Sequence, residues 1–171
     1  MRFLVLIAAL FLTGCWAGEA LYSDSDAKQP IPAGSYRAIN EDGKDGVENV
    51  VLLPNGMTQI GDPDGKALYG FAPLDDQNRR FIVWYRENND NAADARGQVY
   101  LLLERRSNDE FVMYMPKCDD LDGEIAAKAG AIVEKGAIPT CHFKSRASLE
   151  TAMRQLRPTK DLIRIVRVRG E

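Results

Sequence analysis

Short runs of alternating apolar and polar residues, separated by turn-forming residues, occupy most of the chain from Gly34 to Met115. Asn55-Gly56 follows one of these runs, and Asn-Gly after an apolar run is a strong hairpin signal. We expect strands over the ranges 35–39, 48–53, 57–60, 67–72, 79–86, 98–105 and 110–115. Strands at this spacing, joined by short turns, predict an antiparallel meander that forms either a curved sheet or a small barrel.

One of these runs, the range 79–86, is apolar on both faces. Phe81 and Val83 would point to one side of a strand, and Ile82 and Trp84 would point to the other side. We interpret this run as a central strand that is covered on both sides. The aromatic residues of the predicted strands are interpreted as core residues rather than as a platform for a ligand; they are Trp84, Tyr85, Tyr100, Phe111 and Tyr114.

After Cys118 the spacing of apolar residues changes from that of a strand to that of a helix. The apolar positions of the first expected helix, which Gly136 would end, are Ile125, Ala129, Ile132 and Val133. A short strand is expected over 138–143. Ser145 then caps a second, amphipathic helix. Its apolar face consists of Leu149, Ala152, Met153 and Leu156, and the β-branched range 162–169 is expected to form a last strand.

The first fifteen residues have the layout of a secretory signal. Arg2 supplies a positive charge, an uncharged apolar run extends from Phe3 to Leu12, and the small residues Thr13 and Gly14 follow. The apolar run is shorter than the roughly 20 residues that a membrane-spanning helix needs. We therefore expect this segment to direct export rather than to span a bilayer.

The end of this segment, Leu12-Thr13-Gly14-Cys15, resembles the lipobox of bacterial lipoproteins. The resemblance covers only these first fifteen residues. It implies that Cys15 is diacylated through its sulfur, becomes the mature N-terminus and is then acylated on its amine. Trp16 follows where aspartate would favour retention in the inner membrane, which implies sorting to the outer membrane. The alternative is an ordinary secretory signal followed by an incidental cysteine.

The domain organisation follows from this interpretation. Residues 1–14 form the signal peptide, residues 15–32 form a lipidated N-terminus and tether, and residues 33–171 form a single globular periplasmic domain. Leu21 and Tyr22 offer an alternative, in which the tether docks on the domain. The predicted fold class is α+β, a mostly antiparallel β-sheet or small partly open barrel with one or two C-terminal helices packed on it.

Cysteine usage predicts a disulfide. If Cys15 carries lipid, Cys118 and Cys141 remain, and an even pair in an oxidising compartment favours a disulfide bond. The alternatives are two free thiols or a metal pair. His142 is the chain's only histidine, and its position beside Cys141 fits no standard zinc spacing, so we expect no metal site.

The charge is distributed unevenly along the chain. From Lys144 to the C-terminus there are eight basic and three acidic residues, whereas the stretch from Cys15 to Phe143 carries a net charge of −9. Five arginines of the basic end form a candidate patch for an anionic partner: Arg154, Arg157, Arg164, Arg167 and Arg169. The alternative is a solvated face whose positive charges discourage edge-to-edge aggregation.

Motifs for catalysis and for cofactor binding do not stand out. The sequence has no Gly-x-Ser-x-Gly elbow, no Walker-type loop and no Gly-x-Gly-x-x-Gly loop, and its acidic turns do not match an EF-hand. His142 is the only candidate for acid–base chemistry near neutral pH, and in a strand it would point away from Cys141. We therefore expect no cofactor.

The leading hypothesis is a non-enzymatic lipoprotein of the cell envelope that is held at the outer membrane, faces the periplasm, and acts as a binding or assembly module. The membrane would be contacted through the lipid on Cys15. The arginine patch would contact an envelope protein or an anionic envelope polymer, and no nucleic-acid partner is expected. The competing hypothesis is a small-ligand-binding or hydrolytic barrel whose site lies near the loop 87–97.

Overall fold

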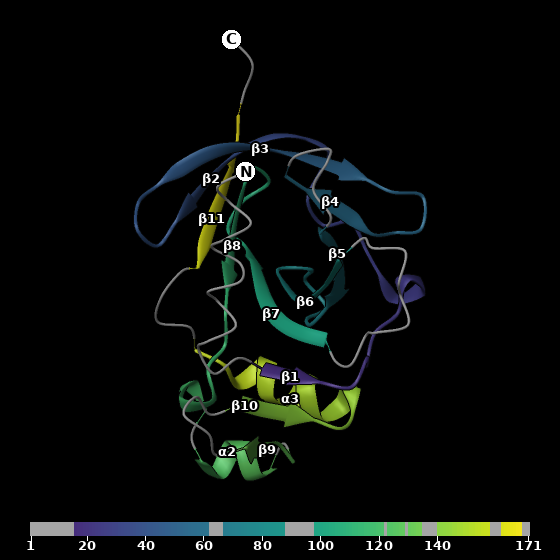
Figure 1. Cartoon of the computed structure of the whole chain (residues 1–171), viewed down its shortest axis with the longest axis vertical. Coiled ribbons are helices and arrows are strands. Elements are labelled where there is room, and N and C mark those ends of the chain that lie inside the picture. Colours follow the sequence, from purple (N-terminus) through teal and green to yellow (C-terminus); the bar gives the residue numbers. More distant parts are fainter. Residues whose placement is uncertain are drawn as a thin grey trace.

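The computed structural model describes residues 16–61, 67–87, 98–121, 123–128, 130–134, 140–157 and 162–168. Among these residues, eight antiparallel strands close into a barrel (Figure 1). These strands are β2 (Gly34–Asn40), β3 (Asp45–Leu52), β4 (Thr58–Ile60), β5 (Ala67–Pro73), β6 (Arg80–Glu87), β7 (Gln98–Arg105), β8 (Glu110–Tyr114) and β11 (Ile163–Arg167). Pairing of β6 with β7 and of β11 with both β8 and β2 completes the ring. The predicted α+β fold is confirmed, and the barrel is closed rather than partly open.

Strand β6 separates two hydrophobic cores, as its sequence predicts. Phe81 and Val83 belong to the core inside the barrel, and Ile82 and Trp84 belong to a second core outside it. All four side chains are at most 2% exposed. The inner core, which fills much of the barrel, consists of Ile31, Tyr36, Val50, Phe71, Phe81, Val83, Leu101, Leu103, Phe111, Met113 and Ile165.

A small second sheet branches from the barrel at strand β7. It contains β1 (Trp16–Gly18), β10 (Thr140–Phe143) and β9 (Ile132–Glu134). Strand β1 pairs antiparallel with the first half of β7 and parallel with β10, and β9 pairs antiparallel with β10. The second half of β7 pairs with β8 instead. Figure 1 shows β1 and β10 beside the barrel, with β9 beyond them.

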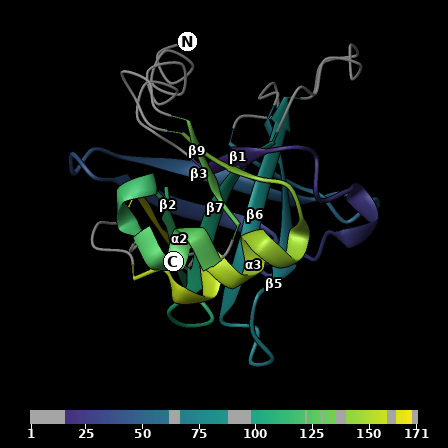
Figure 2. The ribbon, with the colours of Figure 1, turned by 90° about the horizontal axis from the view of Figure 1, so that it is seen from below.

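Helix α3 (Arg146–Gln155) covers the outer core, in front of β5, β6 and β7 in Figure 2. The Oγ of Ser145 accepts a hydrogen bond from the backbone N–H of Ser148, as its predicted cap role requires. Leu149, Ala152 and Met153 are fully buried on one face of the helix. This placement matches the predicted apolar face.

The first expected helix is much shorter than predicted. Helix α2 (Gly123–Lys128) ends before Gly130, whose positive φ of 67° interrupts the helical backbone. Ile132 and Val133 lie in strand β9, where β-branched side chains are favoured, so their assignment to the helix was wrong. Among the described residues, no helix is long and apolar enough to cross a membrane.

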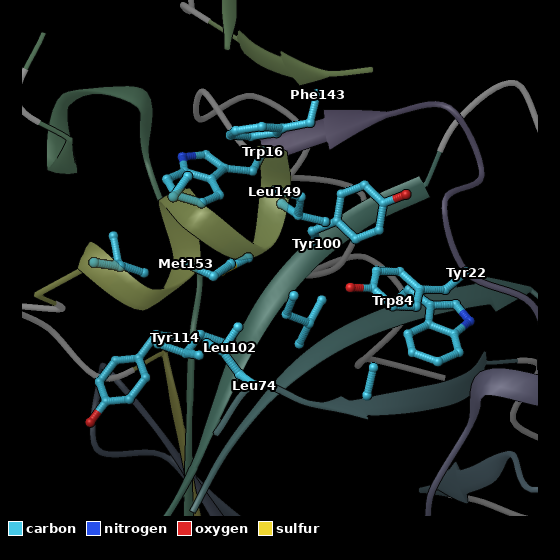
Figure 3. Packing of buried hydrophobic residues seen from close by; sticks show 14 of the residues in the cluster. Trp16, Tyr22, Leu74, Trp84, Tyr100, Leu102, Tyr114, Phe143, Leu149 and Met153 are labelled. Atoms are coloured by element: carbon cyan, nitrogen blue, oxygen red, sulfur yellow. The ribbon is translucent and has the colours of Figure 1, made fainter. Parts of the chain in front are cut away.

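The outer core joins α3, the barrel wall and the N-terminal segment (Figure 3). Tyr22 stacks on Trp84 with ring centroids 4.9 Å apart, and Trp16 lies 4.9 Å from Phe143. Gly70 of β5 leaves space for the indole ring of Trp84, because a Cβ at this position would overlap that ring. Of the predicted core aromatics, Trp84, Tyr100, Phe111 and Tyr114 are buried, and Tyr85 is half-buried.

The N-terminal segment closes one end of the barrel. Ile31 is fully buried in the inner core, the backbone N–H of Lys28 donates to the carbonyl of Phe71, and Tyr36 donates its hydroxyl hydrogen to the Pro32 carbonyl. Arg105 donates to the Pro30 carbonyl at 2.9 Å. Residues 16–32 are therefore packed on the folded domain, as in the alternative in which Leu21 and Tyr22 dock on it, rather than forming a free tether. Burial of large apolar side chains outweighs the flexibility that the polar composition of this segment suggested.

Candidate functional site

Trp16, the first residue that the structure describes, directly follows the predicted lipid-attachment residue. The Trp16 side chain is 0% exposed, and its Nε1 donates to the carbonyl of Lys117 at 3.0 Å. Its backbone pairs with Tyr100 on one side and with Cys141 on the other. Cys15 itself, like residues 1–14, lies outside the described residues. Cys15 is therefore bonded directly to a residue that is built into the sheet.

The structure pairs Cys118 with Cys141, as the cysteine count predicted. Their Cα atoms are 5.5 Å apart, within the range for a disulfide. Cys118 lies in the short 3₁₀ helix η3 (Cys118–Asp120), which follows β8, and Cys141 lies next to Trp16 in β10. The disulfide therefore links the branching sheet to the end of a barrel strand.

A polar contact also holds the N-terminal segment on α3. The guanidinium of Arg146 donates to both carboxylate oxygens of Asp26 at 2.9 Å and lies 4.4 Å from the centre of the Tyr22 ring. The hydrogen bond from Arg146, aided by the backbone N–H of Ser23, lowers the pKa of Asp26 to about 2. Burial and the neighbouring carboxylate of Glu150 raise the pKa of Tyr22. Sequence analysis missed this contact because its partners are 120 residues apart.

The predicted arginine patch is not one surface. Arg164 and Arg167 lie three residues apart in β11 and therefore point to opposite faces of the strand. Arg167 donates to the Ala33 carbonyl at the closed end of the barrel, whereas Arg164 lies 3.9 Å from Glu110. Arg154 and Arg157 lie at the end of α3, and Arg169 is outside the described residues.

Two arginines that the sequence analysis did not select join Arg154 and Arg157. We call these four residues, Arg80, Arg106, Arg154 and Arg157, the arginine cluster. Arg80 is the cross-strand neighbour of Glu104 in the pairing of β6 with β7. The guanidinium of Arg106 lies 3.3 Å from the carboxylate of Glu104. Strand pairing, rather than proximity in the sequence, brings these side chains together.

The cluster borders a depression of about 390 Å³ between the β5–β6 turn and α3. Its lining residues are Leu74, Asp75, Asp76, Arg80 and Arg154. Arg80 donates to the carbonyls of Met153, Arg154 and Leu156 at 3.1–3.2 Å, and so caps the C-terminal end of α3. Burial is the main cause that lowers the Arg80 pKa. At this depression, the hydrogen bonds of Arg80 therefore connect the end of α3 to the barrel wall.

The exposed part of the cluster is better suited to binding. The side chains of Arg106 and Arg154 are 50% and 53% exposed. Arg157 is also exposed, and it donates a long hydrogen bond of 3.5 Å to the Leu156 carbonyl. Guanidinium groups bind carboxylates and phosphates with paired hydrogen bonds. This surface can therefore bind an anionic partner.

The other end of the barrel has a different lining. The inward-facing side chains of Tyr69, Tyr85 and Glu48 are half-buried there, in contrast to the fully buried residues of the closed end. The two tyrosine rings lie 6.2 Å apart, and burial together with the charge of Glu48 raises the pKa of Tyr69. The predicted ligand loop, 87–97, joins β6 to β7 at this end, but residues 88–97 lie outside the described residues.

His142 is half-exposed, whereas the adjacent Cys141 is fully buried, so the two side chains point to opposite faces as predicted. Within the described part of the chain, no three histidine, cysteine or acidic side chains lie close enough together to hold a metal ion. No protein-family model, no curated protein and no solved structure matches the chain.

Proposed function

We propose that this chain is a lipid-anchored protein of the cell envelope whose barrel acts as a non-enzymatic binding or assembly module. The observation that supports the anchor best is the segment Leu12-Thr13-Gly14-Cys15, which resembles a lipobox. This segment predicts processing immediately before Cys15. Trp16, the next residue along the chain, is buried in the sheet, so a lipid on Cys15 would be held close to the folded domain.

The inner core supports a role in binding at the outer surface. An eight-stranded barrel is just wide enough either to be filled by side chains or to hold one small ligand. Here Tyr36, Phe71 and Phe111 occupy the interior and are 0% exposed. The exposed arginines lie outside the barrel wall, where a large partner has access to them.

Replacing Cys15 with serine tests the anchor. Two or three acyl chains hold a protein stably in a bilayer because each buried CH₂ contributes about 0.8 kcal/mol. We expect the wild-type protein to remain with the membrane fraction in high salt and to incorporate labelled palmitate. The Cys15→Ser variant should appear in the soluble fraction without label. Wild-type protein that is unlabelled and soluble would disprove the lipid anchor.

The binding role is tested at Arg157. We expect Arg157→Glu to reduce recovery of the envelope partner about tenfold, which corresponds to the loss of one charge-assisted contact. Arg37→Glu is the matched control, because it makes the same charge change at an exposed arginine of β2, which lies across the barrel from β6. Crosslinking in intact cells, followed by affinity recovery and mass spectrometry, measures the loss. Equal recovery from the two variants would exclude the arginine cluster as the binding surface.

A second function is favoured by the half-buried residues at the other end of the barrel. Tyr69, Tyr85 and Glu48 combine aromatic surface with a carboxylate, a combination that suits a small ligand with an apolar and a polar part. Native mass spectrometry of the protein extracted from the envelope distinguishes the two functions. A retained small molecule would favour this ligand-binding function, whereas a protein partner lost in Arg157→Glu would favour the assembly module.

A further inference from the structure

We propose that the exposed strand β9 contacts lipid beside the acyl anchor, so that the barrel is held on the membrane in one orientation. The proposal rests on the proposed lipidation of Cys15. The surface is the outer edge of β9 with Ile132 and Val133, which point to opposite faces of the strand and so border that edge from its two sides. Both side chains are 43% exposed. Their exposure is unusual for this domain, in which most large apolar side chains are buried.

The register of the branching sheet places this surface close to the anchor. Trp16 pairs with Cys141, and Cys141 pairs with Val133, so the three residues lie in one row across β1, β10 and β9. Ala17, His142 and Ile132 form the next row. Neighbouring strands are about 4.8 Å apart, so Val133 is about 10 Å from Trp16.

The distance of about 10 Å between Trp16 and Val133 matters because no flexible tether separates Cys15 from Trp16. Consecutive Cα atoms are about 3.8 Å apart, so Cys15 lies one such step from a buried, hydrogen-bonded residue. Acyl chains on Cys15 must reach the hydrocarbon core, and the polar zone above that core is only about 5 to 8 Å thick on each side. A side chain about 10 Å from Trp16 is therefore within reach of the lipid surface.

The free edge of β9 leaves these side chains available. Among the described residues, β9 pairs only with β10, and it forms the end of the sheet. Figure 1 shows β9 at the margin of the molecule, on the same side as β1. Val47 and Val51, which are also strongly exposed, lie on β3 at the opposite wall of the barrel, and Val168 follows β11. Among these exposed side chains of the described residues, those of the β9 pair belong to the small sheet that contains Trp16.

Tryptophan placed on this strand tests the contact. The lipidated, mature protein is reconstituted into phosphatidylethanolamine–phosphatidylglycerol vesicles whose acyl chains carry bromine, which quenches nearby tryptophan emission. Trp16 and Trp84 are 0% and 1% exposed, so they provide a constant background. We expect Val133→Trp to lose most of its added emission. Val47→Trp, the matched control at a site that is 65% exposed, should keep its emission.

The outcomes separate the two proposals. If Val133→Trp floats with the vesicles but keeps its emission, and Ile132→Trp does the same, the contact of β9 with lipid is disproved and the anchor remains supported. Equal quenching of Val47→Trp would also overturn the single orientation. If wild-type protein carries no lipid and does not float with the vesicles, the proposed function fails, and the orientation fails with it. An unchanged thermal midpoint verifies that each variant is folded.

Discussion

Replacing Trp16 with alanine should lower the free energy of unfolding by about 3 to 5 kcal/mol, the range measured for truncating large buried aromatic residues. The side chain is 0% exposed, packs on Phe143 and donates a hydrogen bond to the Lys117 carbonyl. Truncation would leave a cavity between β1, β10 and α3, and it would leave that carbonyl without its partner. Urea denaturation in the soluble Cys15→Ser background measures the change.

Two variants serve as controls for the predicted loss of stability. Trp16→Phe keeps most of the ring but removes the hydrogen bond, so its cost should be nearer to 1 kcal/mol. Val47→Ala, at an exposed site on the barrel, should change stability by less than about 0.5 kcal/mol. If Trp16→Ala matched Val47→Ala, the N-terminal segment would behave as the free tether that its composition suggested.

Reducing the disulfide should destabilise the protein by about 3 kcal/mol, because the Cys118–Cys141 bond closes a loop with a sequence separation of 23 residues. The bond also holds β10 in place for its pairing with β1. The comparison is between oxidised and reduced wild-type protein in urea. The Cys118→Ala/Cys141→Ala double variant, which should be insensitive to reductant, is the control. A wild-type midpoint that does not move on reduction would show that the pair is unimportant for stability.

The elements that the sequence predicts well are those whose determinants are local. The apolar run of β6, the Asn55-Gly56 turn and the Ser145 cap all act within a few residues, and each appears in the structure. The disulfide was predictable for a different reason, because only one pair remains after Cys15 is assigned to lipid. Closure of the barrel was not predictable, because it depends on β11 entering between β8 and β2.

The failures share one physical cause, which is partnership between distant parts of the chain. Trp16 finds Tyr100 and Cys141, 84 and 125 positions later, so its local polar neighbours were misleading. The arginine cluster likewise depends on cross-strand neighbours of Arg80. One error had a local signal that was overlooked. Arg164 and Arg167, three apart in a predicted strand, should have been assigned to opposite faces.

The position of β1 between two strands determines how force enters the domain. A pull directed along β1 from its N-terminal end loads the hydrogen bonds to β7 and β10 together, in shear, rather than opening them one after another. Strand β10 is joined covalently through Cys141 to Cys118 in η3, which follows β8, so part of the load passes through this short helix toward the barrel wall. The domain therefore has a mechanically stiff attachment point. Displacement at its N-terminus reaches the barrel without the slack that a linker would introduce.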